Sequence, residues 1–290
     1  MRTLLVPVDH TAVAANAARY AADMALAIDA DVHLLHVVGV PVTPAEIPAG
    51  FLYEQLEKDG ETVLKRLYDE LRSRTNDQVT ITTQQEIGGV GYVIAQRCKH
   101  LAPFAVIMGA PQGSFWGAIA GGPAIDAARH LPYPVLVIPA NATFHRISRI
   151  ALAADSEEIE TALPVNVTFL KELQDLFAAK FEVINVSVGG DKRREEEIFA
   201  SSHWKQALQE IYPELHHFQA PQLSEGIGEY LSQSGSDWLM VFPRKHRWLE
   251  FHKSKSARLL TNARVPVLSI CEAAFRRELN EAGEAGAVNP

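Results

Sequence analysis

The sequence holds only two cysteines, Cys98 and Cys271, among 290 residues. Two thiols so far apart exclude a disulfide framework and a cysteine-based zinc ribbon, and they fit a reducing compartment. Long apolar runs are missing as well, since none approaches the roughly 18–20 residues that a membrane helix needs. The first apolar stretch, TLLVPV, ends at once in Asp9 and His10, which makes it too short for a signal-peptide core. We therefore expect a soluble, cytoplasmic protein with no membrane partner.

Basic residues are fewer than acidic ones. Lys and Arg number 27 against 35 Asp and Glu, a formal net charge of −8. Such an acidic balance disfavours general affinity for nucleic acid. Apolar residues make up 47% and charged residues 21%, which is typical of a folded globular chain. A length of 290 residues suits two domains better than one.

The chain repeats itself. Four landmarks of the first half recur in the same order in the second. They are TLLVPVD (3–9) with RIALAAD (149–155), GVG (89–91) with GIG (226–228), PFAVIMG (103–109) with DWLMVFP (237–243), and PVL (134–136) with PVL (266–268). This repetition predicts two domains, 1–140 and 147–272, a linker at 141–143, and a flexible tail over 273–290.

Within each half, short apolar runs alternate with stretches of helical spacing. In the first half the runs predict strands near 3–8, 31–38, 79–86, 104–109 and 134–138. The stretches between them predict helices at 12–29, 51–74, 90–101 and 121–131, and in the second half near 158–178 and 190–211. Strands that are apolar on consecutive residues are typical of parallel sheets buried on both faces. The expected fold is α/β, with two tandem doubly wound domains, each a mainly parallel five-stranded sheet with helices on both faces.

Residues that follow the strands are the first candidates for a ligand site. Asp9 and Asp155 follow the first strand of each half, and Gly109 closes the fourth strand of the first half. In doubly wound sheets ligands bind outside the carboxyl ends of the strands, so these positions face one crevice in each domain. An alternative interpretation is that each aspartate caps the next helix.

The strand ends also carry a family resemblance. The segments VPVD (6–9), LLHVV (34–38), VIMG (106–109) and RHLPYPVLV (129–137) resemble the universal stress protein family, and the second half resembles a diverged copy. The resemblance implies a stress-response protein whose nucleotide-binding members hold adenosine with the acid after the first strand and a valine after the second. It assigns these adenosine positions to Asp9 and Val37.

The family's phosphate loop has the pattern G-x2-G-x9-G-[S/T], and the chain departs from it. The resemblance places Gly109 at the first glycine, Gly121 at the last, and Gly122 where a hydroxyl residue is expected, with a spacing one residue short. Gly113 stands beside the expected middle glycine. Because glycines let backbone N–H groups approach an anion, the candidate cofactor of domain 1 is still ATP with Mg.

The second half departs further from the pattern. Phe242 and Pro243 replace the first glycine, and a basic segment follows at 244–258. Hydroxyl and cationic side chains near a helix start favour anions, which makes this segment a candidate site for a small anionic ligand. The candidate residues there are Asp155, Arg244, Lys253, Ser254 and Ser256. The alternative is a solvated loop whose charges serve solubility.

Signatures of catalysis and metal binding are missing from the sequence. Neither G-x-x-x-x-G-K-[ST] nor H-E-x-x-H occurs. His33 and His36 are three residues apart on an expected strand, so their side chains should point to opposite faces. We therefore predict no metal site, no catalytic residue, and a function that depends on binding a small ligand or a regulatory protein partner. The alternative is an ATP-binding protein with weak hydrolysis in domain 1, and two tandem chains are expected to form a homodimer.

Overall fold

The structure is a computed structural model that describes residues 1–39, 49–110, 123–154, 167–187, 208, 211–242 and 265–271. The chain divides into two compact units. The first comprises 1–111, 121–127 and 133–144, and the second comprises 112–120, 128–132 and 145–290. The domain limits 1–140 and 147–272 stay a prediction, and the expected tail over 273–290 lies outside the described residues.

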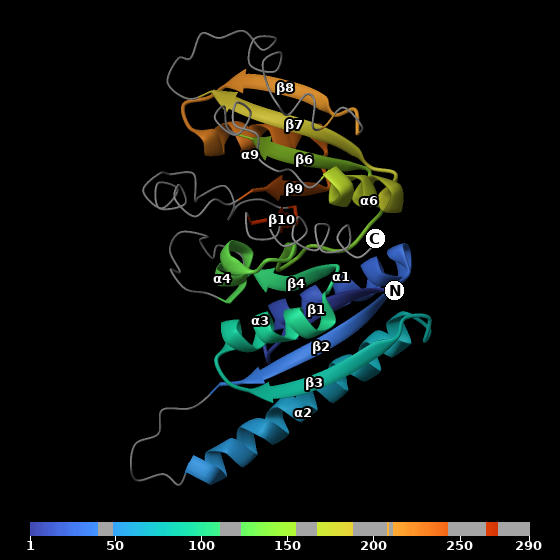
Figure 1. Ribbon diagram of the computed structural model, residues 1–290, viewed down its shortest axis with the longest axis vertical. Helices are drawn as coiled ribbons and strands as arrows, with labels where there is room; N and C mark the ends of the chain where they lie inside the picture. Colours follow the sequence, from blue (N-terminus) through green and yellow to red (C-terminus); the bar gives the residue numbers. More distant parts are fainter. Residues whose placement is uncertain are drawn as a thin grey trace, which may run out of the picture. The chain divides into compact units, whose positions relative to one another are not determined.

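The first unit is a doubly wound parallel sheet (Figure 1). Its strands are β1 (Arg2–Val8), β2 (Ala30–Val38), β3 (Ile81–Ile87), β4 (Ala105–Ala110) and β5 (Val135–Pro139). Its helices are α1 (Ala12–Ile28), α2 (Ala49–Arg74), α3 (Val90–Leu101) and the first part of α4 (Pro123–His130), whose residues from Ala128 on belong to the second unit. The strand order is β3-β2-β1-β4-β5, and the pairs β1–β2, β2–β3, β1–β4 and β4–β5 are parallel.

Helices cover both faces of this sheet. Helices α1 and α2 contact each other and pack on one face, and α3 packs on the other against β1 and β2 (Figure 1). Consecutive residues of β1, namely Leu4, Leu5 and Val6, are fully buried. A strand covered on both faces must be apolar on successive residues, which is the pattern that predicted this fold from the sequence.

Helix α1 is rich in alanine and well capped. Thr11 is its N-cap, and the Thr11 hydroxyl accepts a hydrogen bond from the amide of Ala14 at 3.1 Å. Asn16 on this helix donates to the carbonyls of Pro139 and Ala142 at 3.3 and 2.9 Å. The predicted linker therefore begins as a segment fastened to the first unit.

The second unit repeats the same strand order. Its elements are β6 (Arg149–Ala154), α6 (Val167–Phe177), β7 (Lys180–Ser187), β8 (Glu214–Gln219), α9 (Leu223–Ser234), β9 (Trp238–Val241) and β10 (Val267–Ser269). The order β10-β9-β6-β7-β8 is again parallel in each of these pairs. The fold class expected from the sequence is therefore confirmed.

The expected boundaries differ from the observed ones by a few residues. Strand β3 begins at Ile81 rather than 79, because Asn76 and Asp77 adopt left-handed backbone angles, φ 49° and 56°, in the preceding turn. The helix expected over 158–178 is described only as α6. The helix expected over 190–211 falls almost entirely outside the described residues.

Candidate functional site

The strand order of the first unit reverses between β1 and β4, which is where a doubly wound sheet forms its ligand crevice. The chain proceeds from β1 outward to β2 and β3, and then returns to the other side of β1 to form β4 and β5. At such a reversal the connections leave the sheet in opposite directions, so the carboxyl ends of the two central strands are open to a ligand. Asp9 follows β1 and Gly109 lies near the end of β4, so the structure brings both predicted residues to this edge.

Asp9 is exposed and held in one orientation. Its Oδ1 accepts hydrogen bonds from the Thr11 amide at 2.8 Å and from the Thr11 hydroxyl at 2.5 Å. Thr11, and not Asp9, caps α1, so the capping interpretation of this aspartate is wrong. The carboxylate instead fixes the turn that joins β1 to α1, and it adds a negative charge at the mouth of the crevice.

Val37 lies one strand away at the same edge of the sheet. It is the penultimate residue of β2, half-buried, and opposite Glu86 of β3. The preceding residue, His36, is opposite Val8 of β1. Val37 and Asp9 therefore each come directly after the register pair Val8–His36, so both predicted adenosine residues lie at the carboxyl edge of the sheet.

Gly109 has a packing role that the sequence did not reveal. A Cβ at this position would lie 2.6 Å from the backbone oxygen of Val13 and 2.7 Å from its Cγ1. The first turn of α1 thus approaches the backbone of β4 too closely for any side chain. This contact accounts for the glycine whether or not a phosphate group binds nearby.

The other candidate residues of both domains lie outside the described residues. These are the loop glycines Gly113, Gly121 and Gly122 of domain 1, and Asp155, Arg244, Lys253, Ser254 and Ser256 of domain 2. Their assignment stays a prediction.

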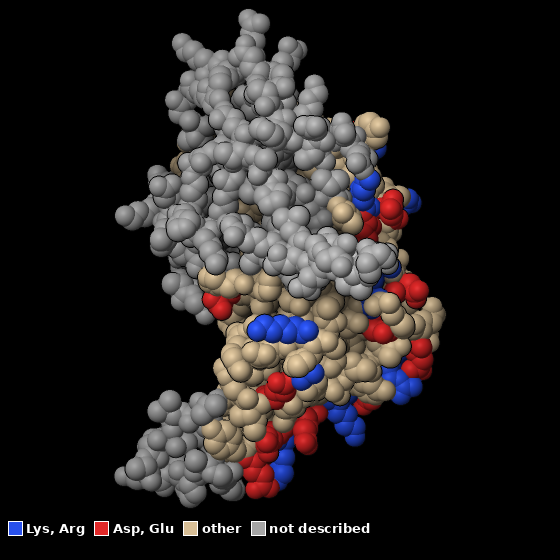
Figure 2. All heavy atoms as spheres, in the orientation of Figure 1, with Lys and Arg blue, Asp and Glu red and all other residues tan. Residues whose placement is uncertain are grey.

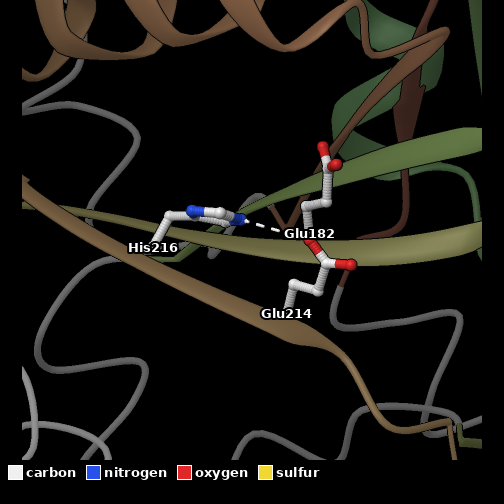
Figure 3. A group of neighbouring side chains, drawn as sticks. All are labelled: Glu182, Glu214 and His216. Atoms are coloured by element: carbon white, nitrogen blue, oxygen red, sulfur yellow. Dashed lines mark ion pairs between the residues drawn. The ribbon is translucent and has the colours of Figure 1, made fainter.

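The second unit contains a polar cluster that sequence reasoning missed. Glu182 on β7, Glu214 on β8 and His216 on β8 offer ligand atoms that all lie within 4.8 Å of one another (Figure 3). Two carboxylates and an imidazole are groups that a transition metal such as zinc accepts. Glu182 and Glu214 occupy opposite positions on neighbouring strands that are far apart in sequence. No short sequence motif could therefore predict that they lie together.

Basic side chains already pair with both carboxylates of this cluster, Arg149 with Glu182 and Lys180 with Glu214. Arg149 donates to Glu182 Oε1 at 3.0 Å, and the Ser236 hydroxyl donates to Glu182 Oε2 at 3.0 Å. The ammonium of Lys180 lies 3.7 Å from Glu214 Oε1, and His216 Nε2 lies 3.9 Å from Glu214 Oε2. A buried charge is stable only when it is paired and hydrogen-bonded, as Glu182 is here. We therefore interpret the cluster as an ion-pair network that lets a glutamate occupy the core.

Tyr230 on α9 belongs to the same network. Its burial, and then the neighbouring carboxylate of Glu182, raise the pKa of Tyr230 well above its ordinary value. The phenol therefore stays protonated and acts as a hydrogen-bond donor to Glu182. It is not available as a base at neutral pH.

Charges of both signs alternate on the surface. Figure 2 shows acidic and basic side chains interspersed over the described part of the chain, and Lys58 pairs with Glu54 one turn away on α2 at 2.7 Å. Nucleic-acid binding requires a continuous basic surface. On the face drawn, the described residues do not form one. Among these residues no helix is both long enough and apolar enough to cross a membrane.

Fold and strand-end geometry together define a class of protein. A doubly wound parallel sheet with an aspartate and a glycine at its point of reversal belongs to the α/β architectures in which ligands bind at the carboxyl edge of the sheet. The sequence model of the Universal stress protein family matches residues 1–139. Through its first half, the chain belongs to the universal stress protein family.

Solved structures share the fold over nearly the whole chain. A universal stress protein from Archaeoglobus fulgidus superposes with a TM-score of 0.66 at 13% identity, covering 92% of this chain and 97% of the other. A putative universal stress protein from Pseudomonas aeruginosa gives a TM-score of 0.54 at 16% identity and covers 98% of both chains. No curated protein sequence matches the chain. At these identities the likeness concerns the fold.

Proposed function

We propose that this protein acts in a stress response by binding an adenosine nucleotide in the crevice of its first unit, without catalysing a reaction. The observation that carries the proposal is the convergence of Asp9, Val37 and Gly109 at the carboxyl ends of β1, β2 and β4. The strand order makes this edge the ligand edge of the sheet. The family resemblance supplies the ligand class.

The geometry favours binding over chemistry. Hydrolysis requires a group that orients or activates water within reach of the phosphates. Among the described residues, Asp9 is the acidic side chain that directly follows β1, and its Oδ1 already accepts two hydrogen bonds from Thr11. Weak ATP hydrolysis in the first unit is the alternative function. Measuring the release of ADP after ATP is added to the protein distinguishes this alternative from binding alone.

A substitution at Asp9 tests the proposal. We expect Asp9→Ala to weaken the affinity for ATP or AMP by about 10- to 100-fold, the value of a hydrogen bond to a charged group. Calorimetric titration of the full chain, with and without Mg²⁺, measures this after bound nucleotide has been removed.

The control is Asp69→Ala, which removes an exposed carboxylate on α2. It should leave the affinity unchanged. A wild-type protein that binds no adenosine nucleotide under either condition would contradict the proposed function.

The remaining sequence expectations are proposals of the same kind. They are a regulatory protein partner that binds the nucleotide-bound form, a homodimer of tandem chains, a cytoplasmic location, and a small anionic ligand at the basic segment of the second half.

A further inference from the structure

A buried histidine joins the two strands that carry the proposed ligand residues. His36 is opposite Val8 in the β1–β2 ladder, and its ring Nδ1 lies 2.9 Å from the Val8 carbonyl oxygen. A carbonyl oxygen can only accept a hydrogen bond, so Nδ1 carries the proton and donates it. The bond ties the last residue of β1 to β2, directly beside Asp9 and Val37.

The same ring supports the residue on the other side of Asp9. The rings of His10 and His36 pack edge to face, with centroids 5.6 Å apart and an interplanar angle of 85°. His36 therefore contacts Val8 before Asp9 and His10 after it. The backbone of Asp9 is held at both of its neighbours by one buried side chain.

A glycine in α2 makes room for this arrangement. A Cβ at Gly60 would lie 2.4 Å from His36 Cδ2 and 2.2 Å from the Gln85 side-chain oxygen. Glycine weakens the interior of a helix, and Gly60 lies well inside α2. Gln85 in turn donates to the Glu57 carbonyl of α2 at 3.1 Å. Helix α2, β3 and β2 thus close around the imidazole and hold it in place.

The second unit shows what this position tolerates. Asn185 pairs with the last residue of β6 as His36 pairs with the last residue of β1. In the first unit His36 is opposite Gln85, and in the second Asn185 is opposite His217, with Asn185 Oδ1 and His217 Nδ1 2.7 Å apart. The two units carry an imidazole–amide pair in reversed order, so an asparagine fits this place in the sheet.

From these contacts we propose that His36 is the positioning residue of the nucleotide site, acting through Asp9, with Gly60 as the residue that admits its ring. This inference rests on the proposed function. His36 itself is buried and acts on the ligand only by fixing the turn that presents the Asp9 carboxylate.

The test compares His36→Leu with His36→Asn in the full chain. Leucine fills the space without a donor, whereas asparagine can place an N–H near the former Nδ1. We expect His36→Leu to weaken AMP binding about tenfold, as for one positioned hydrogen bond, and His36→Asn to restore most of the affinity. His33→Leu is the matched control, because His33 lies on the same strand but contacts Thr82 at 2.8 Å instead, and it should bind AMP as the wild type does.

A double substitution separates positioning from general destabilisation. If His36 acts through Asp9, His36→Leu should have almost no further effect on AMP affinity in the Asp9→Ala protein. If His36→Leu weakened AMP binding equally in the wild-type and the Asp9→Ala proteins, the proposal would be overturned. An unchanged AMP affinity of the single variant His36→Leu would overturn it as well.

A measurement without ligand keeps the inference separate from the proposed function. In His36→Leu, the backbone ¹⁵N order parameters should fall from about 0.85, a rigid value, toward about 0.6 at Asp9, His10 and Thr11. The same values should be retained in His36→Asn. Unchanged order parameters in His36→Leu would overturn the positioning role, whereas a wild-type protein that fails to bind AMP would contradict only the proposed function.

Discussion

Individual residues at the carboxyl edge serve packing and the proposed site at once. Gly109 and Gly60 are both glycines because a neighbouring atom occupies the place of a Cβ: the Val13 backbone oxygen at 2.6 Å and the Gln85 side-chain oxygen at 2.2 Å. Asp9 shapes a turn and also offers a charge to the crevice. A residue type at a ligand edge is therefore weak evidence for a ligand until its packing contacts are known.

The packing role of Gly109 leads to a prediction about stability. Gly109→Ala should lower the free energy of unfolding by about 1–3 kcal/mol, because the new methyl group overlaps the Val13 backbone and α1 must move away from β4. Urea denaturation followed by circular dichroism measures the change. Gly39→Ala is the control, since a Cβ there would have no atom within 4 Å. If the two variants had equal free energies of unfolding, α1 would be able to move away from β4 without loss of stability, which would contradict the prediction.

At the scale of elements, β2 places its two histidines in different environments. His36 faces Gly60 of α2, and His33 lies near Arg97 of α3 on the opposite face of the sheet. The alternation of side chains along a strand predicted this divergence, and it is confirmed. Both rings are almost fully buried, at 6% and 8% exposure, so β2 carries imidazoles inside the core.

His33 makes the first unit sensitive to acid. Burial, and then the positive charge of Arg97, lower the pKa of His33 below its ordinary 6.5, and Glu86 and Gln84 on β3 oppose this shift only in part. Its Nε2 is buried without a hydrogen-bond partner, so a proton there would add a positive charge near the Arg97 guanidinium, which already pairs with Glu86. A histidine with a depressed pKa contributes its full stability above the unfolded pKa and loses it as the pH falls from that value through the lower pKa of the folded state.

The expected result is a fall in unfolding free energy as the pH drops below about 6.5, with a slope under the one-proton limit of about 1.4 kcal/mol per pH unit. His33→Leu should show a shallower dependence in the same interval. Urea midpoints at a series of pH values from neutral to about 5 measure both proteins. Parallel pH profiles would rule out His33 as the source.

At the scale of the whole molecule, the two units share a strand order but differ where the strands end. The first unit ends β4 in Gly109 and Ala110, and the second follows β9 with Phe242, which is 6% exposed. Near the ends of these two strands, one unit therefore carries a glycine and the other a buried phenylalanine. Repetition of the fold therefore does not imply repetition of the site.

This difference predicts one adenosine nucleotide per chain. The nucleotide is expected in the first unit, because β4 ends in Gly109 and Ala110, whereas β9 is followed by the bulkier, buried Phe242. Calorimetry gives the stoichiometry directly, and Asp9→Ala should remove the single binding event. A second equivalent that survives this substitution would show that the other unit also holds the ligand.

The sequence by itself determined the fold class, the repetition and most element boundaries. Runs of consecutive apolar residues, the 3.6-residue spacing between them, and strand-end signals such as Asp9 are local features that neighbouring residues fix. The family resemblance of the first half came from the same segments. Each of these properties depends on residues close together in the chain.

The tertiary structure alone decided which distant residues meet. That Gly60 faces His36, that Val13 fills the space above Gly109, and that Arg149 neutralises Glu182 could not be seen in the sequence. These contacts join residues of separate elements, and their distances are set by how helices pack on the sheet and not by spacing along the chain. The strand ends indicate the proposed site, and the packing of helices on the sheet decides which residues support it.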